Sequence, residues 1–128
     1  MQADAPPPTI LVVDDDPLVR ETLVAVLGAA GLGCRTAANG AEALQAVAVA
    51  PPDLILLDIR MPGLDGVETC RRLKATPASA AIPVIALTGA DDADSVLRMQ
   101  EAGSLMYLAK PFSIESLLAA VRLTLGLL

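Results

Sequence analysis

Short runs of consecutive apolar residues alternate along this chain with longer stretches in which apolar residues recur every three or four positions. A continuous apolar run of about four to eight residues is typical of a strand that is buried on both faces of a parallel sheet. A recurrence every three or four positions predicts an amphipathic helix instead. The runs predict strands at Thr9–Val13, Gly33–Ala37, Asp53–Leu57, Pro83–Leu87 and Leu105–Ala109, of which the second is the weakest.

Five helices are predicted between and after these strands, and residues that favour helix ends bound them. The first spans Pro17–Ala30, with Asp16 as its N-cap and Gly31 at its end. We expect its apolar stripe to comprise Leu18, Thr22, Ala25, Val26 and Ala29. The other four run over Ala41–Ala50, from the cap Asp65 to Ala75, from Asp91–Asp94 to Gly103, and from the cap Ser113 through Leu125. The inward positions are Val67, Cys70 and Leu73 in the third helix, and Ile114, Leu117, Leu118, Val121 and Leu125 in the fifth.

The alternation of strands and helices predicts an α/β fold, a doubly wound parallel sheet of five strands flanked by five helices. The chain has 128 residues, which is the size of one domain and not of two. Its first eight residues contain three consecutive prolines and no periodic pattern. We therefore expect residues 1–8 to be a flexible lead-in and residues 9–128 to form the domain.

Composition and charge exclude several classes of function. The formal net charge of −6 disfavours binding to nucleic-acid phosphates or to an anionic membrane surface. The chain contains no histidine, which removes Ser-His-Asp catalysis, His-ligated zinc and any role as a phosphohistidine carrier. Aromatic residues make up only 2% of the chain, too few for a base-stacking platform.

Cysteine usage and hydropathy indicate where the protein works. Cys34 and Cys70 are far apart in the sequence and form no CxxC pair, so we expect two reduced, buried thiols. No apolar stretch approaches the length of a membrane span, and the chain does not begin with a basic region followed by an apolar signal core. These features together predict a cytoplasmic protein.

Polar side chains follow four of the five predicted strands. In an open parallel sheet, ligands bind beyond the carboxyl ends of the strands. Each polar residue at a strand end has an ordinary structural explanation when it is taken singly, but their joint placement at one edge of the sheet indicates a site. The residues concerned are Asp14, Asp15 and Asp16 after the first strand, Asp58 after the third, Thr88 after the fourth and Lys110 after the fifth.

Clustered carboxylates need a compensating cation. Two of them about 4 Å apart repel by roughly 4 kcal/mol at an effective dielectric constant near 20. Lys110 supplies one positive charge, and a hard divalent ion such as Mg²⁺ would supply the rest, because the available ligands are all oxygens. Such a site suits phosphoryl chemistry with an aspartate as the nucleophile. We expect that nucleophile to be Asp58, the solitary acid at the end of a buried strand that faces the Asp14–Asp15 pair.

Five runs of this sequence resemble the receiver domain of two-component response regulators, the family that includes the chemotaxis regulator. The resemblance covers about residues 9–126, and each motif falls at the expected strand end. It implies the strand order 2-1-3-4-5. The runs are Ile10–Asp16, Asp53–Asp58, Met61–Gly66, Pro83–Thr88 and Lys110–Phe112.

The resemblance implies a phosphorylation-activated switch of a phosphorelay. Asp58 would accept a phosphoryl group from a sensor histidine kinase or a histidine phosphotransfer protein. Mg²⁺ would be held directly by Asp15 and Asp58, through water by Asp14, and by the backbone carbonyl of Arg60. The chain would catalyse only its own phosphorylation and dephosphorylation, and would not be an enzyme in the usual sense.

The resemblance also assigns residues to the switch itself. Lys110 would pair with the phosphoryl oxygens, Thr88 would move to hydrogen-bond them, and Tyr107 would rotate into the space that Thr88 leaves. The bond between Lys110 and Pro111 would be cis. An unknown output protein or domain would read the change on the face formed by the fourth helix, the fifth strand and the fifth helix.

Three other functions are weighed against this one. A metal-dependent phosphatase with an aspartyl intermediate would carry a second acid two residues after the nucleophile, where this chain has Arg60. A pseudo-receiver that only binds partners would not need the complete set of acids, threonine and lysine. A flavodoxin-like redox carrier would need a hydroxyl-rich phosphate loop where this chain has three aspartates.

Overall fold

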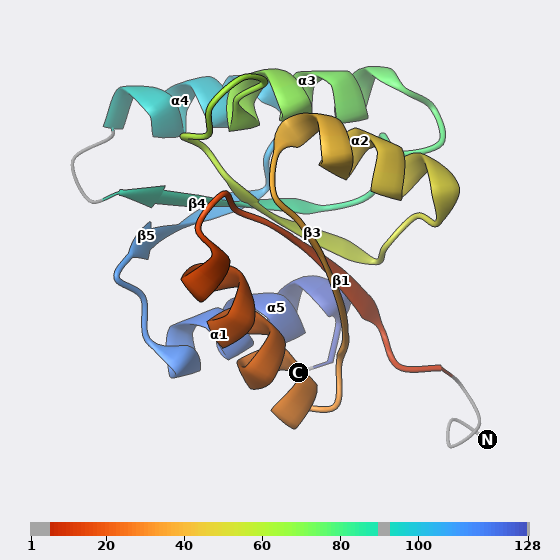
Figure 1. The fold of residues 1–128 in the computed structure, drawn as a ribbon, viewed down its shortest axis with the longest axis vertical. Coiled ribbons are helices and arrows are strands. Elements are labelled where there is room, and N and C mark those ends of the chain that lie inside the picture. Colours follow the sequence, from red (N-terminus) through yellow and green to blue (C-terminus); the bar gives the residue numbers. More distant parts are fainter. Residues whose placement is uncertain (1–5, 90–92, 128) are drawn as a thin grey trace.

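Five parallel strands form a single sheet with the order β2-β1-β3-β4-β5, as predicted (Figure 1). The computed structural model describes residues 6–89 and 93–127. Neighbouring strands pair in parallel throughout, with Val13 of β1 opposite both Ala37 of β2 and Leu57 of β3. The strands are β1 (Thr9–Val13), β2 (Gly33–Ala37), β3 (Leu54–Asp58), β4 (Val84–Gly89) and β5 (Met106–Lys110).

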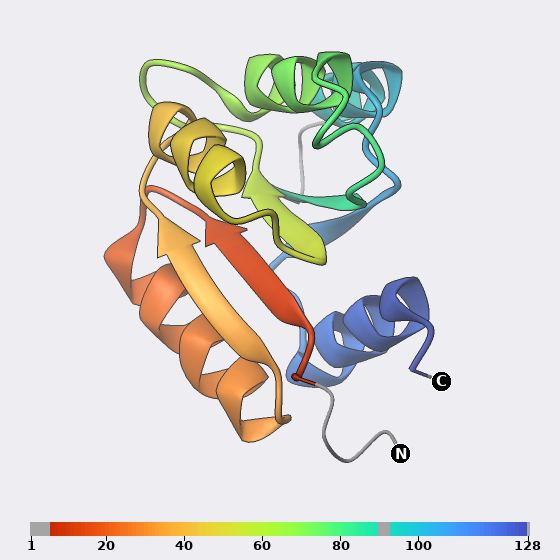
Figure 2. The ribbon, with the colours of Figure 1, turned by 90° about the vertical axis from the view of Figure 1, so that its right-hand side faces the viewer.

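Helices cover both faces of the sheet, which confirms the doubly wound architecture. The helices α1 and α5 lie on one face, and α2, α3 and α4 lie on the other (Figures 1 and 2). Two apolar clusters result, one on each side of the sheet, because successive residues of a strand point to opposite faces. The helices are α1 (Pro17–Ala29), α2 (Gly40–Val49), α3 (Gly66–Ala75), α4 (Ala93–Ala102) and α5 (Ile114–Leu125).

Side-chain caps fix where the helices begin. Asp16, Asn39, Asp65 and Ser113 each accept a hydrogen bond from a backbone N–H in the first turn of the helix that follows. Three of these caps are the predicted ones, and Asn39 begins α2 one residue earlier than expected. Because each capped helix is the next element after a strand, the caps also shape the loops at the carboxyl edge of the sheet.

The strand at the far edge of the sheet differs from the prediction. The residues of β1, β3 and β4 are buried almost throughout, as their continuous apolarity indicates. In β5, however, partly buried and exposed positions alternate, and Tyr107 is 49% exposed. The reason is that β5 is an edge strand and that α4 packs mainly against α3 and β4. The expectation of burial on both faces is therefore wrong for this strand.

The prediction of which residues of α1 face the sheet is also wrong, because the buried stripe lies one residue further along the helix than expected. Leu18 is 67% exposed, whereas Leu23 and Leu27 are buried against the sheet. Two overlapping stripes exist in this helix, and the one with the larger side chains faces inward because it buries more apolar surface. In α5, Leu117 and Val121 are buried as expected, but Ile114 at the first position is exposed.

Several further predictions concern the termini, the thiols and membranes. Both cysteines are free thiols, with Cys70 buried and Cys34 partly buried. Residues 1–5 of the expected lead-in and residues 91–92 of the expected fourth helix lie outside the described residues. Within the described residues, no helix has the length and apolarity that crossing a bilayer requires.

Candidate functional site

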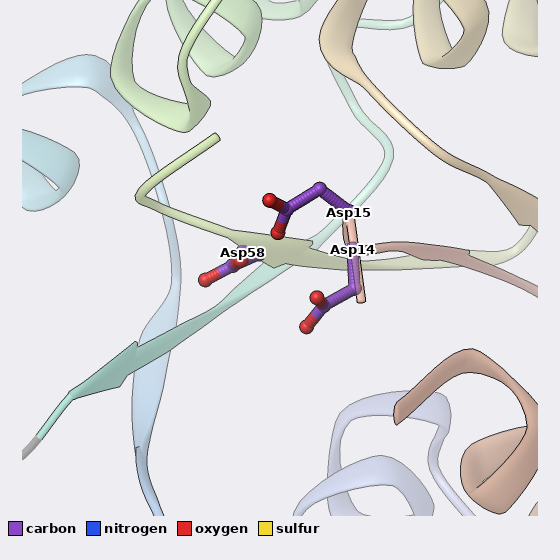
Figure 3. A group of neighbouring side chains, drawn as sticks. All are labelled: Asp14, Asp15 and Asp58. Carbon is purple, nitrogen blue, oxygen red and sulfur yellow. The ribbon is translucent and has the colours of Figure 1, made fainter. Parts of the chain in front are cut away.

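Three aspartates meet at the carboxyl ends of the two central strands. Asp58 is the last residue of β3, and Asp14 and Asp15 directly follow β1, which pairs with β3. One carboxylate oxygen from each lies within 4.8 Å of the others. Figure 3 shows the three side chains gathered there. The predicted convergence of these acids is thus present in the structure.

Asp14 is fully buried and is held by hydrogen bonds in several directions. Its Oδ1 accepts from the backbone N–H of Asp16 at 2.9 Å, and its Oδ2 accepts from Nζ of Lys110 at 2.9 Å. Its backbone N–H donates to the carbonyl oxygen of Ala37 on β2 at 3.2 Å. Burying a carboxylate is costly unless it is paired, and these contacts supply the pairing.

Asp15 has the opposite environment. Its side chain is exposed, and in the part of the chain that the structure describes its carboxylate makes no hydrogen bond or ion pair. Its carboxylate nevertheless belongs to the acidic cluster (Figure 3). Asp15 is thus available as a ligand, whereas much of the hydrogen-bonding capacity of Asp14 is already used.

Asp58 is the acid whose ionisation is most perturbed. Burial raises its pKa to about 6, and the negative charges of Asp14 and Asp15 act in the same direction. Lys110 opposes them, with Nζ 3.4 Å from Oδ1 of Asp58. Asp58 is 6% exposed, so its carboxylate is largely shielded but not sealed.

Lys110 ends β5 and carries the positive charge of the site. Burial alone would lower its pKa, but its hydrogen bond to Asp14 and the charges of Asp58 and Asp14 outweigh burial and raise the pKa. The ammonium group is therefore charged at neutral pH. The peptide bond between Lys110 and Pro111 is cis, as predicted.

Two residues that shape the site were not identified from the sequence. Arg20 of α1 donates from Nη1 to the backbone oxygen of Asp14 at 2.7 Å. Gly66 begins α3 close to the end of β3. A Cβ at this position would collide with the carbonyl oxygen of Asp58 and lie 2.7 Å from Cα of Ile59. The sequence signals that could have found them are the arginine one turn into the first helix and the glycine directly after the cap Asp65.

Among the described residues, the predicted switch residues make no hydrogen bond to the acidic cluster. Thr88 is buried, and its hydroxyl donates to the carbonyl oxygen of Gly89 at 3.2 Å. The register pairs Ala86 with Tyr107 and Thr88 with Ala109, so Thr88 and Tyr107 point to the same face of the sheet. Tyr107 is 49% exposed on that face.

Arg60, whose carbonyl is a predicted metal ligand, lines a groove two residues after Asp58. The groove has a volume of about 750 Å³ and runs between the loop after β3 and α4. Charged side chains of both signs line it, from Arg60, Asp65, Asp94 and Arg98. Its lining includes residues 59–62, which directly follow Asp58 in the sequence.

The donor set fits a hard divalent cation. Three carboxylates from adjacent strands face one another, and Lys110 neutralises only part of their charge. Oxygen ligands at this spacing match the preference of Mg²⁺, which binds through one or two carboxylates and retains several waters. An α/β sheet with this strand order and an acidic cluster at the ends of its central strands is the arrangement expected of a receiver domain.

The comparison with known proteins identifies the family. Residues 10–122 match the family described as "Response regulator receiver domain". The chain is 43% identical over 116 residues to response regulator MprA of Mycobacterium sp. (strain KMS), an alignment that covers 91% of this chain and 50% of MprA. The chain therefore belongs to the response regulator receiver domain family, and it spans about half the length of this curated relative.

Solved structures agree with this assignment. A putative response regulator from Chloroflexus aurantiacus superposes with a TM-score of 0.90 at 40% identity, covering 94% of this chain and 98% of that one. The receiver domain of sensor histidine kinase PA1611 from Pseudomonas aeruginosa superposes with a TM-score of 0.87 at 31% identity, covering 94% of this chain and 98% of that one. That structure has a magnesium ion coordinated in its active site cleft.

Proposed function

We propose that the protein is a phosphorylation-activated switch in which Asp58 accepts a phosphoryl group in a Mg²⁺-dependent reaction. The observation that carries this proposal is the convergence of Asp14, Asp15 and Asp58 within 4.8 Å, with Lys110 Nζ 3.4 Å from Asp58. Asp15 and Asp58 are the direct metal ligands in this proposal, together with the backbone carbonyl of Arg60, and Asp14 acts through water. The family and the magnesium-bound relative support the assignment.

The transfer uses the carboxylate of Asp58 as the nucleophile. An oxygen of Asp58 forms a bond to phosphorus, and the phosphorus–nitrogen bond of a phosphohistidine breaks, with its electron pair left on the imidazole of the donor. Asp58 reacts in its ionised form, which prevails above its pKa of about 6. Bound Mg²⁺ would neutralise negative charge on the phosphoryl oxygens, and Lys110 contributes a second positive charge at the same place.

Phosphorylation then changes the contacts of three residues. The new dianionic group offers three acceptor oxygens. Thr88 exchanges its bond to Gly89 for one to the phosphoryl group, and Lys110 moves its ammonium from Asp14 toward the same group. Tyr107 turns inward on the face that it shares with Thr88. The altered surface is formed by α4, β5 and α5.

The partners follow from this chemistry. The chain has no histidine, so the phosphohistidine must belong to another protein or to another domain. We assign that role to a sensor histidine kinase or a histidine phosphotransfer protein, with an output protein or domain that reads the α4–β5–α5 face. A cytoplasmic site of action is part of the same proposal. Nucleic acid and membrane are not proposed as ligands.

Incubation with phosphoramidate and Mg²⁺ tests the proposal, because this small donor carries the phosphorus–nitrogen bond of a phosphohistidine. Intact-mass measurement should show one added phosphoryl group on the wild type and none on Asp58→Asn. Asp16→Asn is the matched control and should react like the wild type, since asparagine also caps helices. An unmodified wild type would favour the pseudo-receiver, and steady turnover of a small phosphoester would favour the phosphatase.

A further inference from the structure

Arg20 reaches back from α1 to the loop that carries the acids. It lies within the first turns of the helix, after the cap Asp16, and Cβ atoms in a helix tilt toward the N-terminus. Its Nη1 donates to the backbone carbonyl oxygen of Asp14 at 2.7 Å. The arginine is partly buried, so this contact is sheltered from solvent.

The carbonyl oxygen that Arg20 holds belongs to the peptide unit between Asp14 and Asp15. A peptide unit is planar, so fixing the oxygen of Asp14 also fixes the direction in which the N–H and Cα of Asp15 leave it. Asp14 is anchored on its other side by the bond from its N–H to Ala37. The backbone on which Asp15 stands is therefore held from β2 and from α1.

Asp15 depends on this backbone because its own side chain has no internal anchor. Within residues 6–89 and 93–127, its carboxylate has no hydrogen-bond partner. Its approach to Asp58 is consequently set by the orientation of the peptide that precedes it. This contrasts with Asp14, whose carboxylate is fixed by Lys110 and Asp16.

We propose that Arg20 is a positioning residue for the Mg²⁺ ligand Asp15. This inference rests on the proposed function, because it assumes that the acidic cluster binds Mg²⁺. Arg20 touches neither the metal nor the phosphoryl group. It orients the Asp14–Asp15 peptide so that the carboxylate of Asp15 faces Asp58 before the metal arrives.

If Arg20 acted only through its positive charge, its removal would change Mg²⁺ affinity in the opposite direction from the loss of a positioning residue. A cation near the cluster repels Mg²⁺, so removing the charge of Arg20 would strengthen Mg²⁺ binding if charge were all that mattered. Removing the hydrogen bond that orients Asp15 would weaken binding instead. The sign of the change in Mg²⁺ affinity therefore separates the two explanations.

Calorimetric titration of the metal-free full chain with MgCl₂ provides the test. Arg20→Met should weaken Mg²⁺ binding by about tenfold, the size typical for residues that orient metal ligands. Arg20→Lys should also bind more weakly than the wild type, because the lysine nitrogen ends one bond short of Nη1. Arg35→Met is the matched control, since Arg35 also donates to a backbone carbonyl, that of Ala50, but from the middle of β2. It should bind Mg²⁺ like the wild type.

Phosphorylation kinetics give a second, independent measurement. The Mg²⁺ concentration for half-maximal phosphorylation by phosphoramidate should rise in Arg20→Met, whereas the rate at saturating Mg²⁺ should stay near that of the wild type. Wild-type or tighter Mg²⁺ binding by Arg20→Met would overturn the inference. If Arg20→Met does not fold, wild-type affinity in Arg20→Lys would overturn it equally. Failure of the wild type itself to bind Mg²⁺ would instead contradict the proposed function, and the inference with it.

Discussion

Lys110 Nζ lies 2.9 Å from Oδ2 of Asp14, although the two residues are 96 positions apart in the sequence. Asp14 is fully buried, so this contact supplies the positive charge that its carboxylate requires. The same nitrogen is 3.4 Å from Oδ1 of Asp58. The lysine is thus hydrogen-bonded to Asp14 while it lies close to Asp58, the proposed phosphoryl acceptor.

Lys110→Met should destabilise the metal-free protein by about 1–3 kcal/mol, because a buried carboxylate loses its charged partner. The same substitution should raise the pKa of Asp58 further, since Lys110 lowers it in the wild type. Urea unfolding at pH 7 measures the first effect. Adding Asp14→Asn to the variant should recover part of the lost stability, and strict additivity of the two substitutions would show that the residues are not coupled.

The pKa of Asp58 predicts how stability depends on pH. The folded protein holds this proton up to a pKa of about 6, above the ordinary value of 3.8, so the folded state binds it more tightly than the unfolded chain does. The contribution of Asp58 to the free energy of unfolding therefore falls as pH rises from about 4 to about 6. Asp58→Asn should be more stable than the wild type by about 1–3 kcal/mol at pH 7.5 without metal.

The advantage of Asp58→Asn should nearly vanish near pH 4, where the wild-type carboxyl is protonated in the folded protein and about half protonated in the unfolded chain. Urea unfolding at both pH values in the presence of a chelator measures it. Glu101→Gln, which neutralises an exposed acid on α4, serves as the control and should show no such change. A constant difference between Asp58→Asn and wild type at both pH values would contradict the burial of charge at Asp58.

Asp15→Asn should separate metal binding from folding. Because the Asp15 carboxylate has no hydrogen bond within the described residues, the variant should retain the metal-free stability of the wild type within about 0.5 kcal/mol. Wild-type protein in Mg²⁺ at one hundred times its Kd should gain about 2.7 kcal/mol, and Asp15→Asn should lose most of this gain. Thermal unfolding with and without Mg²⁺ measures it, with Asp16→Asn expected to match the wild type.

Tyr107 provides a direct optical report of the switch, because the chain contains one tyrosine and no tryptophan. Phosphorylation or beryllofluoride binding should protect Tyr107, now 49% exposed, from quenching of its fluorescence by acrylamide. In Thr88→Val the phosphoryl group should still bind, but the protection should be reduced because the hydroxyl is missing. Thr88→Ser should behave like the wild type. Full protection of Tyr107 in Thr88→Val would show that the inward movement of Tyr107 does not depend on the hydrogen bond from Thr88.

Gly66→Ala should disturb the acceptor strand. Its new Cβ would collide with the carbonyl oxygen of Asp58, so we expect a loss of about 1–3 kcal/mol in stability and slower phosphorylation. Gly28→Ala in α1 is the matched control, because no atom lies within 4 Å of a Cβ there. That substitution should stabilise the helix by about 0.5 kcal/mol. Chemical unfolding and mass measurement after reaction with phosphoramidate compare the two variants.

The helices and most strands could be predicted because they depend on local sequence, and the meeting of the acids could be predicted because parallel strands end at one edge of the sheet. The strand order came only from the resemblance to the receiver family. Continuous apolar runs mark β1, β3 and β4 correctly, since these strands are covered on both faces. The run at β5 is just as apolar, but nothing in it reveals that the strand lies at the edge of the sheet. In α1 two stripes share Val26, and only the packing of the helix on the sheet decides between them.

Within the site, sequence reasoning located the charged groups but not their mutual contacts. Convergence of strand ends predicts that Asp14, Asp58 and Lys110 meet, and they do. That Lys110 prefers Asp14, and that Arg20 holds a backbone oxygen, depends on side-chain paths through space. The role of Gly66 depends on a close approach between α3 and β3 that a linear motif cannot display.

The adjacent acids Asp14 and Asp15 differ in how freely they could change over evolution or by design. Replacing Asp14 removes the side-chain hydrogen bonds from Lys110 of β5 and from the backbone N–H of Asp16, so that position is constrained by the scaffold. Asp15 carries no such constraint, and the cation selectivity of the centre could be altered there at little structural cost. A designer seeking a Ca²⁺- or Mn²⁺-selective variant would begin at Asp15, where ligand length and charge can vary independently of the architecture.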